Sequence, residues 1–185
     1  MPESIIKAGE AKMEKSIESL KRELQLIRTS RANPTVLNGV TVSYYGVDTP
    51  INQIASISVP EAQLLVIKPY DKSILKDLEK AIQSANLNLT PQSDGTVIRI
   101  NFPALTEVRR KELVKEVKKV QENGKVAIRN IRRDMMEELK ELEKESLITE
   151  DELKRYNEKV QKSTDKYVQV CEDVCREKEA SIMEI

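Results

Sequence analysis

A row of positive charges between Arg109 and Arg133 is the sequence feature with the clearest chemical meaning. This stretch holds ten basic and three acidic residues. Its regular members recur at steps of three or four residues, and only Glu122 interrupts them; they are Lys111, Lys115, Lys118, Lys125, Arg129 and Arg132. Like charges repel at this spacing on a helix, so a long row of one sign indicates a polyanionic partner. Arginine matches phosphate oxygens in geometry. The 3% aromatic content favours structured RNA over single strands bound by base stacking.

The residues that usually perform catalysis are absent or badly spaced. The chain has no histidine and no tryptophan, and its five glycines are too scattered to form a phosphate-binding loop. Cys171 and Cys175 would share one helix face, where two thiols complete neither a disulfide framework nor a metal site. We interpret them as small apolar residues of a helix interface. Asp71 and Asp94 have the surroundings of turn or cap residues. The sequence therefore predicts no enzyme, no metal and no cofactor.

The overall composition excludes further classes of protein. The 185 residues include 31 basic and 31 acidic side chains, and 39% are hydrophobic, below the usual globular share. A thinly cored or elongated protein is expected. No apolar run approaches the roughly 20 residues needed to span a bilayer. The first residues carry neither a signal-peptide core nor an Arg-rich transit pattern. We expect a cytoplasmic monomer without a membrane partner.

Three stretches outside the centre of the chain have the apolar spacing of helices packed in a bundle. The first seam is Met13, Ile17, Leu20, Leu24 and Ile27; the second runs from Leu113 to Leu142; the third runs from Leu153 to Val174 and is widened by Val168, Cys171 and Cys175. Thr149, followed by Glu152 three residues later, forms a capping box that predicts the start of the last helix.

The second of these helices, expected over residues 107–145, would be roughly 58 Å long at 1.5 Å per residue. Gly124 lies on its apolar seam, where we expect it to permit close approach of the helices rather than to act as a hinge. Lys111 lies two residues before the seam position Leu113, about 200° around the helix. The positive row is therefore expected to face away from the bundle core.

Residues 32–104 differ from the rest of the chain, because they hold six of the seven prolines and only 11 charged residues. Short strands are expected at residues 40–44, 57–59, 64–67, 87–89 and 98–102, with one helix at about 74–85. They predict an open mixed sheet or a small sandwich. Of Tyr44 and Tyr45, alternation exposes one ring and buries the other. Two neighbouring linkers predict a hinge; they consist of Ala32, Asn33 and Pro34, and of Pro103, Ala104 and Leu105.

Several short motifs together resemble the bacterial ribosome recycling factor family. They are Arg28-Thr29-Ser30-Arg31-Ala32, Tyr44-Tyr45-Gly46 with Thr49-Pro50, Asp94-Gly95 before Ile98-Arg99, Leu105-Thr106-Glu107 with Arg109-Arg110-Lys111, and Arg129-Asn130-Ile131-Arg132-Arg133-Asp134. Each motif alone is weak, but their order and spacing match essentially from end to end. Ser30 departs from the family's usual glycine, a change expected to stiffen the hinge, and Val108 stands where an acidic residue is common.

The resemblance implies an α+β fold with an L-shaped, tRNA-like outline. A long three-helix bundle, residues 1–31 and 105–185, would carry an inserted small α/β domain, residues 32–104. It further implies binding to the post-termination ribosome through large-subunit ribosomal RNA. With elongation factor G, which hydrolyses GTP, the protein would promote dissociation into subunits. The positive row and the family's arginines together give the expected ribosome-binding residues, which are Arg28, Arg31, Arg109, Arg110, Lys111, Lys115, Lys118, Lys125, Arg129, Arg132 and Arg133.

A second hypothesis rests on the acidic end of the chain. Residues 134–185 hold nine basic and 16 acidic side chains. The bundle could then be a scaffold that binds protein partners through its last helix, without RNA. Ionic strength separates the two hypotheses, because RNA binding through the positive row weakens steeply as salt rises.

Overall fold

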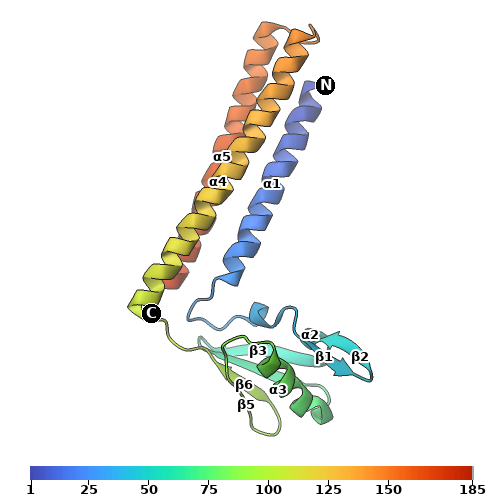
Figure 1. The fold of residues 1–185 in the computed structure, drawn as a ribbon, viewed down its shortest axis with the longest axis vertical. Helices are drawn as coiled ribbons and strands as arrows, with labels where there is room; N and C mark the ends of the chain where they lie inside the picture. The colour runs from blue at the N-terminus through green and yellow to red at the C-terminus, as the bar shows by residue number, and fades with distance from the viewer. Residues whose placement is uncertain (185) are drawn as a thin grey trace. The chain divides into compact units, whose positions relative to one another are not determined.

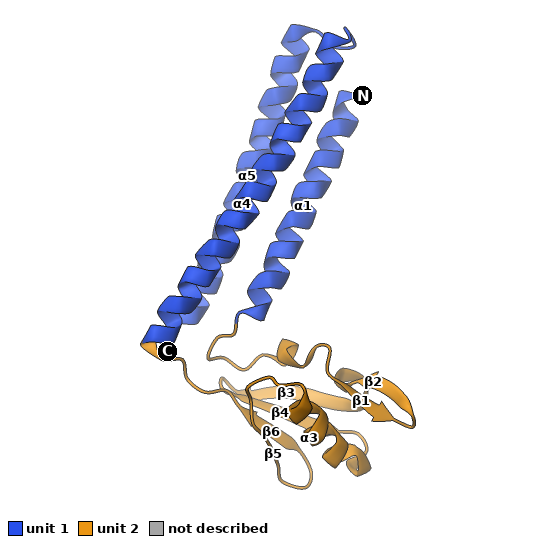
Figure 2. Cartoon of the chain, in the orientation of Figure 1, with its two compact units in different colours: residues 1–27, 108–184 blue, residues 28–107, 185 orange. Residues whose placement is uncertain are grey.

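The computed structural model describes residues 1–184, which form two compact units. Unit 1 comprises residues 1–27 and 108–184, and unit 2 comprises residues 28–107 (Figure 2). The sequence predicted these boundaries at 31/32 and 104/105. Ala32 is buried in the core of unit 2, where its N–H donates a hydrogen bond to the Ala62 carbonyl at 2.6 Å.

Unit 1 consists of three long helices that lie side by side (Figure 1). They are α1 (Pro2–Leu26), α4 (Glu107–Lys144) and α5 (Glu150–Met183). The 38 residues of α4 span about 57 Å at 1.5 Å per residue. The predicted helix over residues 107–145 is confirmed within one residue. Within residues 1–184, no helix combines the length and apolar content needed to cross a bilayer.

Polar bonds between α1 and α5 show that these two helices run in the same direction. Tyr156 donates to Glu3 at 2.7 Å, Ser163 to Glu10 at 2.5 Å, and Tyr167 to Glu14 at 3.1 Å. Each pair is separated by 153 residues in the sequence, and a constant offset requires parallel helices. The hydrogen bond to Glu3 raises the pKa of the Tyr156 hydroxyl, and the same bond lowers the pKa of Glu3.

The bundle core follows the predicted seams, with a shift on α5. The five seam residues expected for the first helix are all buried. On α5, however, the fully covered residues are Val160, Thr164, Cys171, Cys175 and Ile182. The cysteines that were expected only to widen this seam are therefore at its centre. Burial raises the pKa of both thiols, that of Cys175 to about 12, so they are protonated core residues.

Two glycines lie where the helices of the bundle approach most closely. A Cβ atom at Gly124 would lie 3.2 Å from Cys171 Sγ and 3.2 Å from Leu20 Cδ1, so all three helices meet there. This confirms close approach as the role of Gly124. At Gly9 on α1 a Cβ atom would lie 2.2 Å from Met135 Sδ on α4. Sequence reasoning gave Gly9 no role, because its partner lies 126 positions away.

Unit 2 contains two antiparallel sheets. A hairpin is formed by β1 (Thr41–Tyr44) and β2 (Val47–Pro50), and a four-stranded sheet has the order β3 (Ala55–Glu61), β4 (Leu64–Pro69), β6 (Ile98–Asn101), β5 (Pro91–Ser93). The remaining elements are the short helices η1 (Pro34–Leu37), α2 (Ile51–Ile54) and η2 (Lys72–Ile74), and the longer helix α3 (Leu75–Ser84). The mixed sheet expected from the sequence is wrong, since every strand pair is antiparallel.

Two strand predictions in unit 2 also need correction. Residues 87–89 form no strand, because Asn86 and Asn88 have positive φ angles of 53° and 57°, a conformation that breaks extended structure. Strand β2 was not predicted. It pairs with β1 through a two-residue turn at Tyr45 and Gly46, both with positive φ. The expected alternation is confirmed: the Tyr45 ring is exposed, whereas Tyr44 packs against the core.

Candidate nucleic-acid interface

Helix α4 carries the positive row along its first two thirds. Nine of the expected ribosome-binding residues lie on it, and six of these are exposed: Arg109, Lys111, Lys115, Lys118, Arg129 and Arg133. Arg110, Lys125 and Arg132 are partly covered. A helix of this length keeps residues seven apart on nearly the same side, because seven residues complete almost two turns. Lys111, Lys115, Lys118, Arg129 and Arg133 thus lie within about 60° of one another around the helix axis, whereas Arg109, two residues before Lys111, lies on the opposite side.

The row does not face away from the core along its whole length, contrary to the prediction. Lys125 directly follows the seam residue Gly124, about 100° around the helix, and this flank of α4 is covered by α5. Its ammonium forms an ion pair with Glu172 at 2.8 Å, and its side chain is only 17% exposed. The hydrogen bond to Glu172 raises the pKa of Lys125 in spite of burial. The rotation of about 200° between a cation and the apolar seam was derived for Lys111. Lys125 lies at a different angle from the seam, so that rotation does not describe it.

Arg132 is partly covered as well, since its Nε atom is buried without a hydrogen-bond partner. Of the exposed arginines of α4, Arg109 forms an ion pair with Glu112 at 3.0 Å, whereas Arg129 and Arg133 have longer internal bonds. Arg129 lies 3.8 Å from Glu122, with both side chains more than half exposed, and Arg133 donates to Asn130 at 3.2 Å. Exposed pairs of this kind contribute at most about 1 kcal/mol. Arg129 and Arg133 can therefore exchange these partners for phosphate oxygens at little cost.

Arg28 and Arg31 belong to unit 2 and not to the bundle. Arg31 is exposed. The Arg28 guanidinium is partly buried and donates a hydrogen bond to the carbonyl of Leu87. These two arginines thus belong to a different unit from the row on α4, and Arg28 has a protein partner inside its own unit.

The linker residues expected to form a hinge have unequal environments within unit 2. Ala32 is buried, and Asn33 caps η1 by accepting a hydrogen bond from the Thr35 N–H at 3.1 Å. Pro34 is the first residue of that helix. Of the second linker, Pro103 and Ala104 are exposed and Leu105 is partly buried. The hinge at these two linkers stays a prediction, because these environments describe unit 2 alone.

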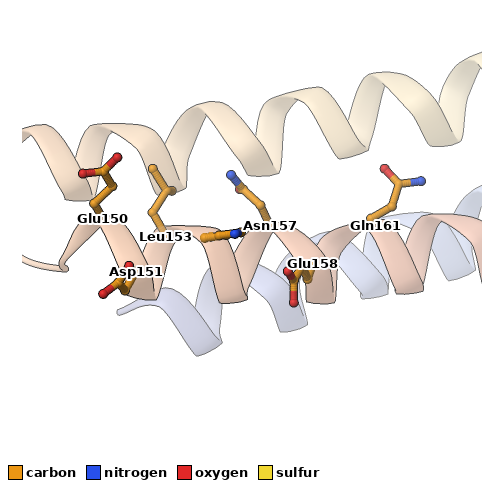
Figure 3. Close-up of a pocket in the computed structure, with 7 residues that line it drawn as sticks. Glu150, Asp151, Leu153, Asn157, Glu158 and Gln161 are labelled. Carbon is orange, nitrogen blue, oxygen red and sulfur yellow. The ribbon is translucent and has the colours of Figure 1, made fainter.

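An open hollow lies on α5 in unit 1. It has a volume of about 630 Å³ and is lined by Glu150, Asp151, Leu153, Lys154, Asn157, Glu158 and Gln161. Figure 3 shows Glu150, Leu153, Asn157 and Gln161 along one side of the helix, with Asp151 and Glu158 along another. The lining contains carboxylates, amides and one lysine. Across residues 1–184, no three His, Cys, Asp or Glu side chains gather in a way that could hold a metal ion.

Sequence reasoning missed two residues that matter for this surface. Lys119 is exposed on α4 four residues after Lys115, and the same four-residue step could have identified it. Glu172 neutralises Lys125 from α5. Its acidic type was visible in the sequence, but its position opposite Lys125 depends on how the two helices pair.

Comparison with known proteins decides the family. Residues 20–183 match the sequence model of the family described as ribosome recycling factor. The chain belongs to the ribosome recycling factor family. The chain is 57% identical to a ribosome-recycling factor of Geobacillus sp. strain WCH70 and 56% identical to that of Bacillus subtilis strain 168, each over 185 residues and the whole of both chains. The resemblance seen in the short motifs is thereby confirmed.

Solved structures of this family agree with the fold. A solution structure of the ribosome recycling factor matches with a TM-score of 0.81 and 42% identity, covering 100% of this chain and 98% of that chain. A Thermus thermophilus ribosome recycling factor matches with a TM-score of 0.68 and 41% identity over 100% of both chains. The latter comes from models in which it and the Escherichia coli elongation factor G are bound to the E. coli post-termination complex.

Proposed function

We propose that this chain recycles ribosomes after termination. It binds the post-termination ribosome through large-subunit ribosomal RNA and, with elongation factor G and GTP, promotes dissociation into subunits for a new round of translation. Family membership and the relative described with elongation factor G on the post-termination complex support this assignment. The observation that carries the RNA contact is the set of exposed cations on one side of α4, which are Lys111, Lys115, Lys118, Lys119, Arg129 and Arg133.

The physical basis of binding is the release of counterions from RNA phosphates. Each Lys or Arg that neutralises a phosphate releases bound salt, so the affinity falls as the salt concentration rises. A rigid helix presents its cations at fixed spacing, which suits recognition of the shape and backbone of a folded RNA. Arg129 and Arg133 are the strongest candidates for phosphate contacts, because arginine offers a planar fork of donors and their present partners are weak. Lys125 is a poorer candidate, since Glu172 holds it.

The chain is proposed to act as a translation factor and not as an enzyme. It offers no paired nucleophile and base, so the energy for splitting comes from GTP hydrolysis by elongation factor G. Action on ribosomes is compatible with the cytoplasm and with a monomer. The protein's own contribution is then to occupy the ribosome and to pass on movement between its two units.

Co-sedimentation with large ribosomal subunits at two salt concentrations tests the RNA contact. Arg129→Ala and Arg133→Ala should each weaken binding and lower the slope of log affinity against log salt by roughly one. Lys162→Ala on α5 is the matched control, because it removes an exposed cation outside the row. If Lys162→Ala weakens binding as much as Arg129→Ala does, the proposed surface is wrong.

A protein-binding scaffold is the alternative, and the carboxylate-lined hollow on α5 is the observation that favours it. This alternative predicts that Asp151→Ala with Glu158→Ala disrupts function while Arg129→Ala does not. It also predicts a weak dependence of ribosome co-sedimentation on salt. The same sedimentation series therefore distinguishes the two functions.

A further inference from the structure

The positive row on α4 is interrupted at its middle by an ion pair with the neighbouring helix. Between the exposed residues Lys119 and Arg129, the only cation of α4 is Lys125. Its ammonium lies 2.8 Å from the Glu172 carboxylate on α5, and the two side chains are 17% and 33% exposed. The charge at the middle of the row is therefore neutralised by a residue of a different helix.

Lys125 belongs to the row by its position on the helix. At about 100° per residue, it lies about 40° around the helix axis from Arg129 and about 40° from Lys111. Lysine carries its charge on a flexible four-carbon stem, which lets the ammonium move away from the place where its Cα lies. If no carboxylate held it, the Lys125 ammonium would be within reach of the side of α4 that the exposed cations occupy.

The carboxylate of Glu172 is a strong competitor for any phosphate that approaches Lys125. Its hydrogen bond is the main cause of the raised pKa of Lys125, and the charges of Glu172 and Glu122 act in the same direction. Lys125 therefore stays protonated, and its charge is balanced inside the protein. The pair of Arg129 with Glu122 is different, because it is 3.8 Å long and both side chains are more than half exposed, which leaves it nearly without energetic effect.

We propose that Glu172 is a positioning residue that limits the affinity for ribosomal RNA, because it holds Lys125 against α5 and so removes one cation from the row. This inference rests on the proposed binding of ribosomal RNA through α4. A factor that recycles ribosomes has to leave the large subunit before it can act again. A row with one phosphate contact fewer dissociates faster, since affinity differences among variants of one interface lie mostly in the dissociation rate.

The test uses the full-length protein and Glu172→Gln, which removes the charge but keeps an oxygen that can accept a hydrogen bond from Lys125. Co-sedimentation with large ribosomal subunits over a series of salt concentrations measures the affinity. The variant should bind several-fold more tightly at low salt, and its slope of log affinity against log salt should be steeper by roughly one. Labelled Glu172→Gln, chased with unlabelled protein, should leave the large subunit several-fold more slowly.

Asp173→Asn is the matched control, because it removes the same charge at the adjacent position. The Asp173 carboxylate accepts hydrogen bonds from Gln169 at 2.9 Å and Arg176 at 3.4 Å, on its own helix. Its removal should leave the affinity and the salt slope as they are in the unchanged protein.

Two further variants separate the effect on Lys125 from an effect on packing. Glu172→Asp keeps the carboxylate on a shorter stem, so it should keep the salt slope of the unchanged protein, whereas a purely structural role would make it resemble Glu172→Gln. The double variant Lys125→Met with Glu172→Gln is compared with Lys125→Met alone. It should show no gain in affinity, because the cation that Glu172→Gln releases is then absent.

Three results would overturn this assignment. An unchanged affinity and salt slope in Glu172→Gln, or the loss of its cooperative melt, would mean that the ion pair serves only the bundle. An equal gain in affinity by Asp173→Asn would mean that net charge alone sets the binding. A failure of Arg129→Ala to weaken ribosome binding would instead count against the proposed function, which the comparison of Glu172→Gln with Asp173→Asn does not test.

Discussion

At the scale of single residues, one carboxylate organises the turn between β5 and β6. Asp94 Oδ1 accepts hydrogen bonds from the Thr96 N–H at 2.9 Å, the Val97 N–H at 2.9 Å and the Thr96 hydroxyl at 2.8 Å. The other oxygen of Asp94 lies 3.3 Å from Arg99. The Val97 and Thr96 amides, in that order, are the main cause of a pKa lowered from 3.8 to about 2. The ionised form of Asp94 is therefore part of the folded turn.

This shift predicts a specific sensitivity to acid. Because the folded pKa of Asp94 lies below its unfolded value, its contribution to stability is fully present above pH 3.8 and is lost as pH falls toward 2. Asp94→Asn should be less stable than the unchanged protein at pH 6 and should lose less of its melting temperature between pH 4 and pH 2. Calorimetric scans across pH 2 to 6 measure both effects.

Thr96→Ala is the matched control for this prediction, since it keeps the carboxylate and removes only the hydroxyl donor. Its acid sensitivity should lie between those of the unchanged protein and Asp94→Asn. A variant Asp94→Asn that loses melting temperature as steeply as the unchanged protein would contradict the assignment.

The sequence predicted the setting of a residue well where that setting depends on near neighbours in the chain. It predicted the setting less well where it depends on packing between helices. Asp94 was expected in a turn and Cys171 in a helix interface, because both inferences depend on near neighbours in the chain. The partial burial of Lys125 was not foreseen, since it depends on which helix covers the flank of α4. Thr164 was also missed as a core residue. Its hydroxyl bonds the Val160 carbonyl one turn earlier at 2.8 Å, which allows a polar residue to be buried.

At the scale of elements, the contact of α1 with α4 depends on the absence of a side chain at Gly9. The Met135 side chain fills the space beside it, and Met135 is 3% exposed. A methyl group at position 9 would occupy the place of the Met135 sulfur. The two helices are therefore packed at a distance that only glycine permits here.

Gly9→Ala should destabilise the bundle by about 1 kcal/mol, because an overpacking cost of about 1–3 kcal/mol exceeds the helix-propensity gain of up to about 1 kcal/mol. Gly124→Ala should be closer to neutral, since its neighbours at 3.2 Å need to move by only a few tenths of an ångström. Urea unfolding followed by circular dichroism gives both values.

A double variant tests whether position 9 and the Met135 side chain are energetically coupled. Met135→Ala makes room for a methyl group at position 9, so Gly9→Ala should cost less in that background than in the unchanged protein. Strictly additive effects would mean that Gly9 and Met135 are not coupled, and the packing explanation would fail.

Helices were easier to predict than strands in this chain, for physical reasons. The start of α5 follows from a local capping box, with Thr149 Oγ1 accepting from the Glu152 N–H at 3.1 Å. Strand β2 is four residues long, ends in Pro50 and has mostly exposed side chains, so it carries little apolar signal. Residues 87–89 alternate like a strand, but two asparagines in the left-handed conformation turn the backbone. In both cases the local backbone conformation decides the outcome, and the spacing of apolar residues does not reveal it.

At the scale of the whole molecule, the two units divide the work that we propose. The exposed cations of α4 lie in unit 1, whereas unit 2 is a continuous insertion of residues 28–107. Helix α4 ends at Lys144 and α5 begins at Glu150, and Figure 1 shows these two helices running in opposite directions. Because α1 runs parallel to α5, α1 ends at the same end of the bundle where α4 begins. A short flexible loop can therefore connect them in place of unit 2.

Replacing residues 28–107 with a Gly/Ser loop should leave a folded bundle that binds but does not split ribosomes. Far-UV circular dichroism and a cooperative melt report the fold. The shortened protein should compete with the unchanged protein for large subunits, through α4. It should fail to dissociate post-termination complexes in the presence of elongation factor G and GTP, as followed by light scattering.

Either of two outcomes would contradict this division of work. Loss of helicity in the shortened protein would mean that the units do not fold independently. Splitting at the rate of the unchanged protein would mean that unit 2 is dispensable. A separate control, splitting by the intact protein without elongation factor G or GTP, should give no signal.

The constant offset of 153 residues between α1 and α5 has a consequence for the protein's own synthesis. Helix α1 leaves the ribosome first, and the helix parallel to it leaves last. At about 5–20 residues per second, its apolar seam waits roughly 8 to 30 s for that partner. Unit 2 is continuous in sequence and can fold during this interval. The bundle closes only after α5 has been synthesised, so its assembly follows the synthesis of unit 2.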